Sequence, residues 1–225
     1  MTADDATVTA DLPGAALLRL VEVMDTLRVA CPWDARQTHE SLAPHLLEEC
    51  YEALEALESG DPAALRDELG DVLLQVVFHA RVAAERTDGT GFTIDDVAAG
   101  IVGKLTRRHP HVFGDVKVTG PEEVKRNWDA IKAAERASAG TGPASAVDSV
   151  PFGQPALALT AQLQHRAERV GAPPELADQV GSEIGAELFA LVAKARRAGL
   201  DPELELRAAA RCYASRVRAW EHPNT

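Results

Sequence analysis

The sequence predicts an all-α protein, a bundle of four main helices followed by a second and degenerate helical repeat. Residues that favour strands are scarce, because the 225 residues include only four isoleucines and 4% aromatic residues. Alanine and leucine dominate the segments in which apolar residues recur with helical spacing. Alternation typical of a strand is nearly absent, and 116–118 is the best short candidate.

The helices of the first part have recognisable start and stop signals. The first helix is expected to end at Cys31-Pro32, because proline does not continue a helix. Pro44 suits the first turn of the second helix, and Asp61 and Thr93 are expected to cap the third and fourth. The expected helices are 15–30, 41–59, 63–85, 94–108 and 121–138. Short connections between the main helices predict a bundle.

Composition divides the chain into four parts. A stretch of small and polar residues is typical of a linker between two helical regions. The expected parts are a disordered tail at 1–14, a main helical domain at 15–136, a linker at 137–150 and a second helical region at 151–225.

The second region resembles a worn copy of the first. Glu68–Arg81 aligns with Glu183–Arg196, and the apolar positions of the two segments coincide. Asp71 is replaced by Ala186, and no acidic helix precedes the second segment at a comparable distance. The second region is therefore expected to have a structural or dimerising role and to have lost catalytic activity. Chance similarity between two helices rich in alanine and leucine is the alternative.

Charge and cysteine content exclude several function classes. Lys and Arg total 23 against 35 Asp and Glu, and a net charge of -12 disfavours binding to nucleic acid or anionic membranes. No apolar run approaches the ~20 residues of a membrane helix, and the acidic start of the chain is unlike a leader. The three cysteines are an odd number at wide spacing, which favours reduced thiols over disulfides or zinc. We therefore expect a soluble cytoplasmic protein.

Five carboxylates occupy two successive helices. Glu48, Glu49 and Glu52 fall on one arc of the second helix. Glu68 and Asp71 are three residues apart on the third helix, which is otherwise apolar nearly all round and is expected to be buried. If the two helices pair antiparallel, the carboxylates converge and repel one another unless a cation or protons are bound. A hard cation such as Mg²⁺ suits such a site, whereas a solvated acidic face is the plainer alternative.

Two further features accompany the carboxylates. Lys104, Arg107 and Arg108 lie three and four residues apart near the end of the fourth helix, where they can hold phosphate charge or merely complement the helix dipole. Gln75 and His79 continue the acidic stripe of the third helix. A histidine in such a place more often forms a hydrogen bond within a core than takes part in catalysis.

The ordered set of motifs resembles one known family. Glu48-Glu49-x-x-Glu52 followed after fifteen residues by Glu68-x-x-Asp71 is similar to the signature of the all-α nucleoside triphosphate pyrophosphohydrolases. Flanking motifs narrow the resemblance to MazG; they are Cys31-Pro32-Trp33-Asp34, Gln37-Thr38-His39, Lys104–Phe113 and Asn127-Trp128-x-x-Ile131-Lys132. The likeness is strong over 17–135 and weaker over 150–221.

The resemblance implies hydrolysis of ribo- or deoxynucleoside triphosphates to the monophosphate and pyrophosphate, by attack of water on the α-phosphorus. It also implies dependence on Mg²⁺, a homodimer, and the broad base tolerance of an enzyme that clears non-canonical nucleotides. By position, the Mg²⁺ ligands are Glu49, Glu52, Glu68 and Asp71. Glu48 is a further ligand or orients the water. The residues expected to bind the substrate are Lys104, Arg107, Arg108, Trp128 and Lys132, although Trp128 also suits a packing role.

Alternatives remain at this point. In the best-known two-domain pattern of the family both halves carry the acidic signature, whereas here only the first half does. We therefore place the activity in 15–136. The rival functions are a pyrophosphatase specific for one deoxynucleotide or for phosphoribosyl-ATP, and a non-catalytic helical protein that binds a basic partner through its acidic face.

Overall fold

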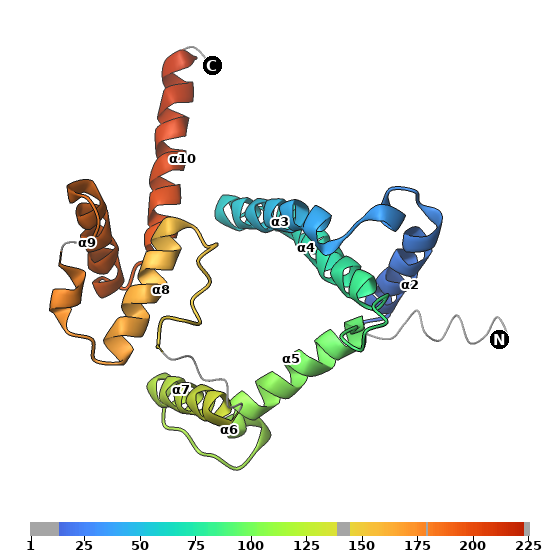
Figure 1. Ribbon diagram of the computed structural model, residues 1–225. Helices are drawn as coiled ribbons and strands as arrows, with labels where there is room; N and C mark the ends of the chain where they lie inside the picture. Colours follow the sequence, from blue (N-terminus) through green and yellow to red (C-terminus); the bar gives the residue numbers. More distant parts are fainter. Residues whose placement is uncertain (1–13, 139–144, 179, 223–225) are drawn as a thin grey trace. The chain divides into compact units, whose positions relative to one another are not determined.

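The computed structural model describes residues 14–138, 145–178 and 180–222, and Figure 1 shows that they are helical. The helices are α2 (Ala15–Ala30), α3 (His39–Ser59), α4 (Pro62–Ala83), α5 (Ile94–Arg108), α6 (Pro110–Phe113), α7 (Pro121–Ser138), α8 (Ala156–Arg169), α9 (Glu183–Arg197) and α10 (Pro202–Glu221), with short 3-10 turns η1 (Asp34–Arg36) and η2 (Pro174–Ala177). No strand occurs among the residues in these ranges, so the all-α prediction is confirmed. The predicted tail, apart from Gly14, and residues 139–144 of the predicted linker lie outside the described residues.

The helix boundaries follow the local capping signals. Asp61 accepts hydrogen bonds from the first backbone N–H groups of α4, and the Thr93 side chain accepts one from Asp96 at the start of α5. The predicted start of α3 at Ser41 was wrong by two residues. Thr38 is the N-cap, and Ser41 is the third helical residue, whose hydroxyl accepts from the Thr38 N–H. The short segment 116–118, the best strand candidate in the sequence, is irregular.

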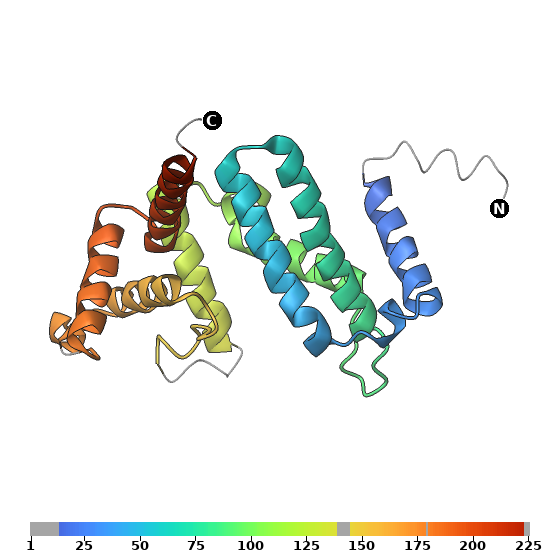
Figure 2. The same ribbon diagram turned by 90° about the horizontal axis from the view of Figure 1, so that it is seen from above.

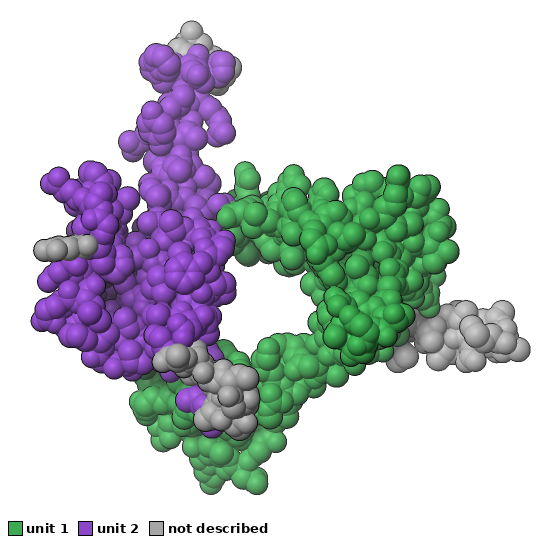
Figure 3. Space-filling model, viewed as in Figure 1, with its two compact units in different colours: residues 1–131 green, residues 132–225 purple. Residues whose placement is uncertain are grey.

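The described residues form two compact units, which belong to 1–131 and 132–225 and are coloured separately in Figure 3. The division falls inside α7, a few residues before the predicted linker.

The centre of the first unit is an antiparallel hairpin of α3 and α4, which lie side by side along their length (Figure 2). Gly60 allows the tight turn between them because it adopts a positive φ of 71°. Helix α2 packs against α4 and completes a small core. The buried members of that core are Met24, Leu42, Val77 and Phe78.

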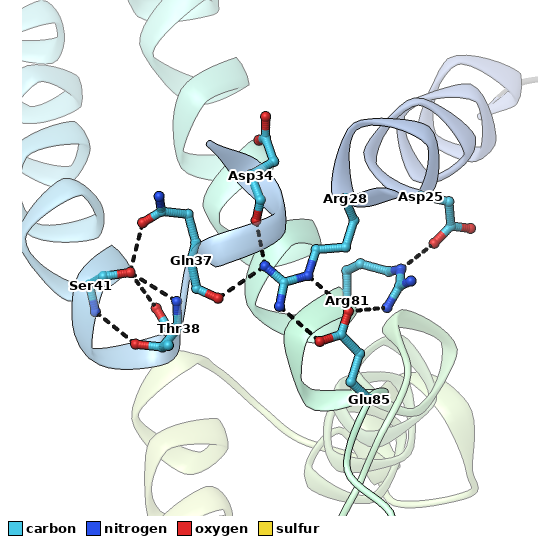
Figure 4. A network of polar contacts seen from close by, with 8 residues as sticks. All are labelled: Asp25, Arg28, Asp34, Gln37, Thr38, Ser41, Arg81 and Glu85. Carbon is cyan, nitrogen blue, oxygen red and sulfur yellow. Dashed lines mark hydrogen bonds and ion pairs between the residues drawn. The ribbon is translucent and has the colours of Figure 1, made fainter. Parts of the chain in front are cut away.

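A polar network fastens the start of this hairpin to α2 (Figure 4). Arg28 makes two parallel hydrogen bonds of 2.8 Å to the Glu85 carboxylate. The same guanidinium donates to the backbone carbonyls of Asp34 and Gln37, so it also holds the loop between α2 and α3. That loop places the Trp33 ring edge-on to Phe78, with centroids 6.3 Å apart.

Helix α5 leads away from the α3–α4 hairpin (Figure 1). It touches α4 near its start, where Ile94 packs against the core, and none of its own residues is buried. Its apolar side chains Val97, Ile101 and Leu105 are exposed and spaced four residues apart. In one copy of the chain, α5 therefore leaves part of its apolar surface exposed to solvent.

The second unit is built from α8, α9 and α10. Gln164 is buried between α8 and α9, where its amide donates to the Phe189 carbonyl at 2.8 Å. Arg196 of α9 pairs with Glu168 of α8 at 2.6 Å. These contacts join α8 to α9. Among its described residues, the second unit has no cluster of carboxylates like that of the first unit.

Candidate metal centre

Three carboxylates meet across the hairpin. Glu49 comes from α3, and Glu68 and Asp71 come from successive turns of α4. One oxygen of each lies within 4.8 Å of one oxygen of each of the others. Glu49 and Glu68 are half-buried and Asp71 is exposed, so the cluster opens to solvent on one side.

The cluster is electrostatically strained without a cation. Burial raises the pKa of Glu49, and the negative charges of Asp71, Glu52, Glu48 and Glu68 raise it further. Burial likewise raises the pKa of Glu68, followed by the charges of Glu52 and Asp71. Glu52 therefore lies close enough to act on two members of the cluster. The charge of Glu48 acts on Glu49. The Glu48 carboxylate also lies 3.8 Å from His45 Nδ1.

The donor set fits a hard divalent cation. All its donors are carboxylate oxygens, which Mg²⁺ prefers. The oxygens lie within 4.8 Å of one another, and opposite ligands of Mg²⁺ are about 4.2 Å apart, so small side-chain movements would bring them to one ion. Every charge that acts on the pKa of Glu49 or Glu68 is itself a carboxylate, and an ion relieves that repulsion. Three of the four predicted metal ligands thus meet in one cluster, whereas Glu52 is not one of its members. The binding of a metal ion by these four residues stays a prediction.

The predicted phosphate-binding residues are not beside the carboxylates in one copy of the chain. Lys104, Arg107 and Arg108 lie near the end of α5, which leads away from the hairpin (Figure 1). Trp128 of α7 lies against the His109 ring with centroids 5.8 Å apart, so it has a packing contact. Lys132 falls in the second unit. The roles of these five residues in substrate binding stay predictions.

Sequence reasoning overlooked the surroundings of the cluster. His79 Nδ1 lies 2.8 Å from His39 Nδ1, so His79 forms the core hydrogen bond that its position predicted. Leu46, Phe92 and Val97 gather beside it, although their positions in the sequence carry no sign of a shared surface. Only the stripe that connects Asp71 to Gln75 and His79 pointed toward this region.

Fold and site together define an all-α protein with a carboxylate centre suited to a divalent cation. No helix among the described residues is long and apolar enough to cross a membrane. The MazG nucleotide pyrophosphohydrolase domain matches residues 37–113, which span α3, α4 and α5. The chain belongs to the MazG family of nucleotide pyrophosphohydrolases, and the expectation of an enzyme of the hydrolase class is confirmed.

Relatives match over most of their length. The nucleoside triphosphate pyrophosphohydrolase/pyrophosphatase MazG of Thermotoga maritima is 38% identical over 92% of this chain and 86% of its own. The nucleoside triphosphate pyrophosphohydrolase of Escherichia coli K12 is 40% identical over 81% of this chain and 69% of its own. An uncharacterized 26.1 kDa protein of Streptomyces cacaoi is 48% identical over 94% of this chain and 85% of its own. A crystal structure of a mazG-related protein from Thermotoga maritima covers 51% of this chain and 97% of its own, with 30% identity and a TM-score of 0.45.

Proposed function

We propose that this protein hydrolyses ribo- and deoxynucleoside triphosphates to the monophosphate and pyrophosphate, with Mg²⁺ as cofactor and broad base tolerance. The observation that carries the proposal is the meeting of Glu49, Glu68 and Asp71 across the α3–α4 hairpin. The relatives named nucleoside triphosphate pyrophosphohydrolases support the reaction. Removal of non-canonical nucleotides in the cytoplasm is the role that such an activity suits.

The carboxylates divide into two tasks. Glu49, Glu52, Glu68 and Asp71 would hold Mg²⁺, which when bound offsets the negative charge of the triphosphate and of the transition state. Glu48 stands at the edge of this group with its side chain 63% exposed to solvent. Its exposed carboxylate would orient a water molecule toward the α-phosphorus and accept a proton from it. The bond from the α-phosphorus to the bridging oxygen breaks, and pyrophosphate leaves.

The remaining phosphate charge calls for cations, and both arginines of the hairpin, Arg66 and Arg81, are already paired with carboxylates. We infer that Lys104, Arg107 and Arg108 reach the carboxylates when two copies associate. The exposed apolar residues Val97 and Ile101 on the same helix support a homodimer, because association would bury them. Trp128 and Lys132 are proposed to lie near the nucleotide in this assembly.

The second unit is proposed to support the assembly rather than to catalyse. Ala186 on α9 stands at the position that aligns with Asp71. The net charge of -12 also makes nucleoside triphosphates bound with Mg²⁺ more suitable partners than nucleic acid.

Product analysis tests the reaction. The purified protein is incubated with several NTPs and dNTPs in ¹⁸O-labelled water, either with Mg²⁺ or with a chelator. The products are separated and their masses are measured by mass spectrometry. Monophosphate carrying the label, together with pyrophosphate, is expected from many bases and is abolished by chelator. Diphosphate plus phosphate would place the attack at another phosphorus and contradict the proposal, and turnover of a single base would contradict the broad tolerance.

A further inference from the structure

A hollow of about 270 Å³ lies beside the carboxylate cluster, within the first unit. Leu46 of α3 forms one wall, Gln75 and His79 of α4 form the floor, and Phe92 and Val97 from the beginning of the α5 region form the other wall. Ligand sites for drug-sized molecules measure about 300–1,000 Å³, so this space suits one ring system rather than a complete nucleotide.

Two residues that line this hollow each have one buried polar atom without a hydrogen-bond partner. The atoms are Gln75 Oε1 and His79 Nε2. Gln75 is only 5% exposed, in surroundings that are otherwise apolar. Buried polar side-chain atoms are nearly always paired in folded proteins. An acceptor held unpaired in a hollow therefore indicates a place where a ligand supplies the missing donor.

A hydrogen bond to His39 fixes the orientation of the His79 ring. Its Nδ1 shares a 2.8 Å hydrogen bond with His39 Nδ1, and the planes of the two rings differ by 2°. Burial lowers the pKa of His79, and the nearby His39 lowers it further, so both effects favour the neutral ring. If His79 donates the shared hydrogen, its Nε2 is an acceptor. If His39 donates it, the Nε2 of His79 carries a hydrogen and is a donor.

The hollow adjoins the centre where the phosphates would be held. Gln75 follows Asp71 by four residues, which is about one helical turn or roughly 6 Å along α4. When the phosphates of a nucleotide lie at the carboxylates, its base is therefore within reach of Gln75.

We propose that this hollow binds the nucleobase of the substrate and that Gln75 Oε1 accepts a hydrogen bond from an N–H group of the base. This inference rests on the proposed function and identifies a residue that recognises the base. Phe92 is 41% exposed and stands where it can stack on the ring. Because each common base carries an N–H donor on its pairing edge, one acceptor holds all of them and distinguishes little among them.

The test compares ATP with purine riboside triphosphate, which lacks the amino group and hence the donor. For the unaltered protein we expect kcat/KM to be about three- to tenfold lower for purine riboside triphosphate, as for loss of one hydrogen bond. Gln75→Leu removes the acceptor at similar volume, so the two substrates should become equal at the lower value. Calorimetry with the α,β-methylene analogue of ATP and Mg²⁺ should show the same loss in affinity without any reaction.

Controls separate base recognition from folding. Gln164→Leu alters the other buried glutamine, which has partners in the second unit, and should reduce thermal stability without changing the ratio between the two substrates. Phe92→Ala is a second variant in case Gln75→Leu does not fold, and it should raise KM for both substrates by about fivefold or more through lost stacking.

The outcomes distinguish the two proposals. If the unaltered protein releases AMP and pyrophosphate from ATP but its substrate ratio is unchanged by Gln75→Leu, the base assignment is wrong and the proposed function stands. The same holds if Phe92→Ala leaves KM unchanged when Gln75→Leu cannot be purified. If the unaltered protein releases no AMP from any nucleotide, the proposed function and this inference both fail.

Discussion

Glu49 of α3 and Asp71 of α4 face each other across the hairpin, with carboxylate oxygens within 4.8 Å. The charge of Asp71 helps to raise the pKa of Glu49, so the pair opposes the packing of the two helices that carry it. Such a pair is retained where a cation or a reaction requires it.

Substitution of one member should separate activity from stability. For Asp71→Asn we expect a loss of pyrophosphate release of about 10²-fold or more, by analogy with the removal of one electrostatic group from an active site. In chelator, the melting temperature should stay equal or rise, because one repulsive charge is gone. Glu55→Gln, at an exposed position of α3 outside the cluster, serves as the matched control in both assays. A clear drop in the melting temperature of Asp71→Asn would instead assign the residue to folding.

The stability of the fold should depend on the guanidinium group of Arg28. It serves the Glu85 carboxylate and two backbone carbonyls at once, and its side chain is only 8% exposed. A lysine ammonium cannot reproduce that fork, so Arg28→Lys should cost about 1–3 kcal/mol in the free energy of unfolding. Urea denaturation measures the change. Arg19→Lys, at an exposed pair with Glu22, should alter it by less than about 0.5 kcal/mol.

The same network predicts a pH dependence of stability. The hydrogen bond from Arg28 lowers the pKa of Glu85, and the charges of Arg28 and Arg81 lower it further. A carboxyl group with a lowered pKa in the folded state stabilises the protein above its unfolded pKa of about 4.3, and this contribution is lost as the pH falls through the folded value. Melting temperatures between about pH 6 and pH 3 should therefore decline less steeply for Glu85→Gln than for the unaltered protein. Equal slopes would show that this ion pair contributes nothing to acid sensitivity.

A charge on the apolar face of α5 should disrupt the proposed homodimer. Ile101 is 45% exposed and none of the residues of α5 is buried, so Ile101→Asp disturbs no core within one chain. Light scattering after size exclusion should give the molar mass of a dimer for the unaltered protein and of a monomer for the variant. The monomeric variant should also be less active. Val29→Asp on α2, where the side chain is 79% exposed, is expected to remain a dimer and active. A monomeric unaltered protein with full activity would contradict the proposal that Lys104 and Arg107 come from a second copy.

The sequence predicted the helices closely because their signals are local. Asp61 and Thr93 cap the helices that follow them, as their side-chain chemistry requires. The start of α3 was misplaced because a capping box joins two residues three positions apart, and either can be taken for the cap. Spacing also identified the carboxylates, since residues three and four apart share a helical face.

By itself, then, the sequence determined an all-helical chain, its acidic helix pair and its family. The tertiary structure decided which carboxylates meet, since that depends on the register in which α3 packs on α4. It also decided that the basic end of α5 lies away from them and that Gln75, one helical turn from Asp71, is buried with its Oε1 atom unpaired. Helical periodicity shows which residues share a face of one helix, whereas distances between helices follow from packing over the whole unit.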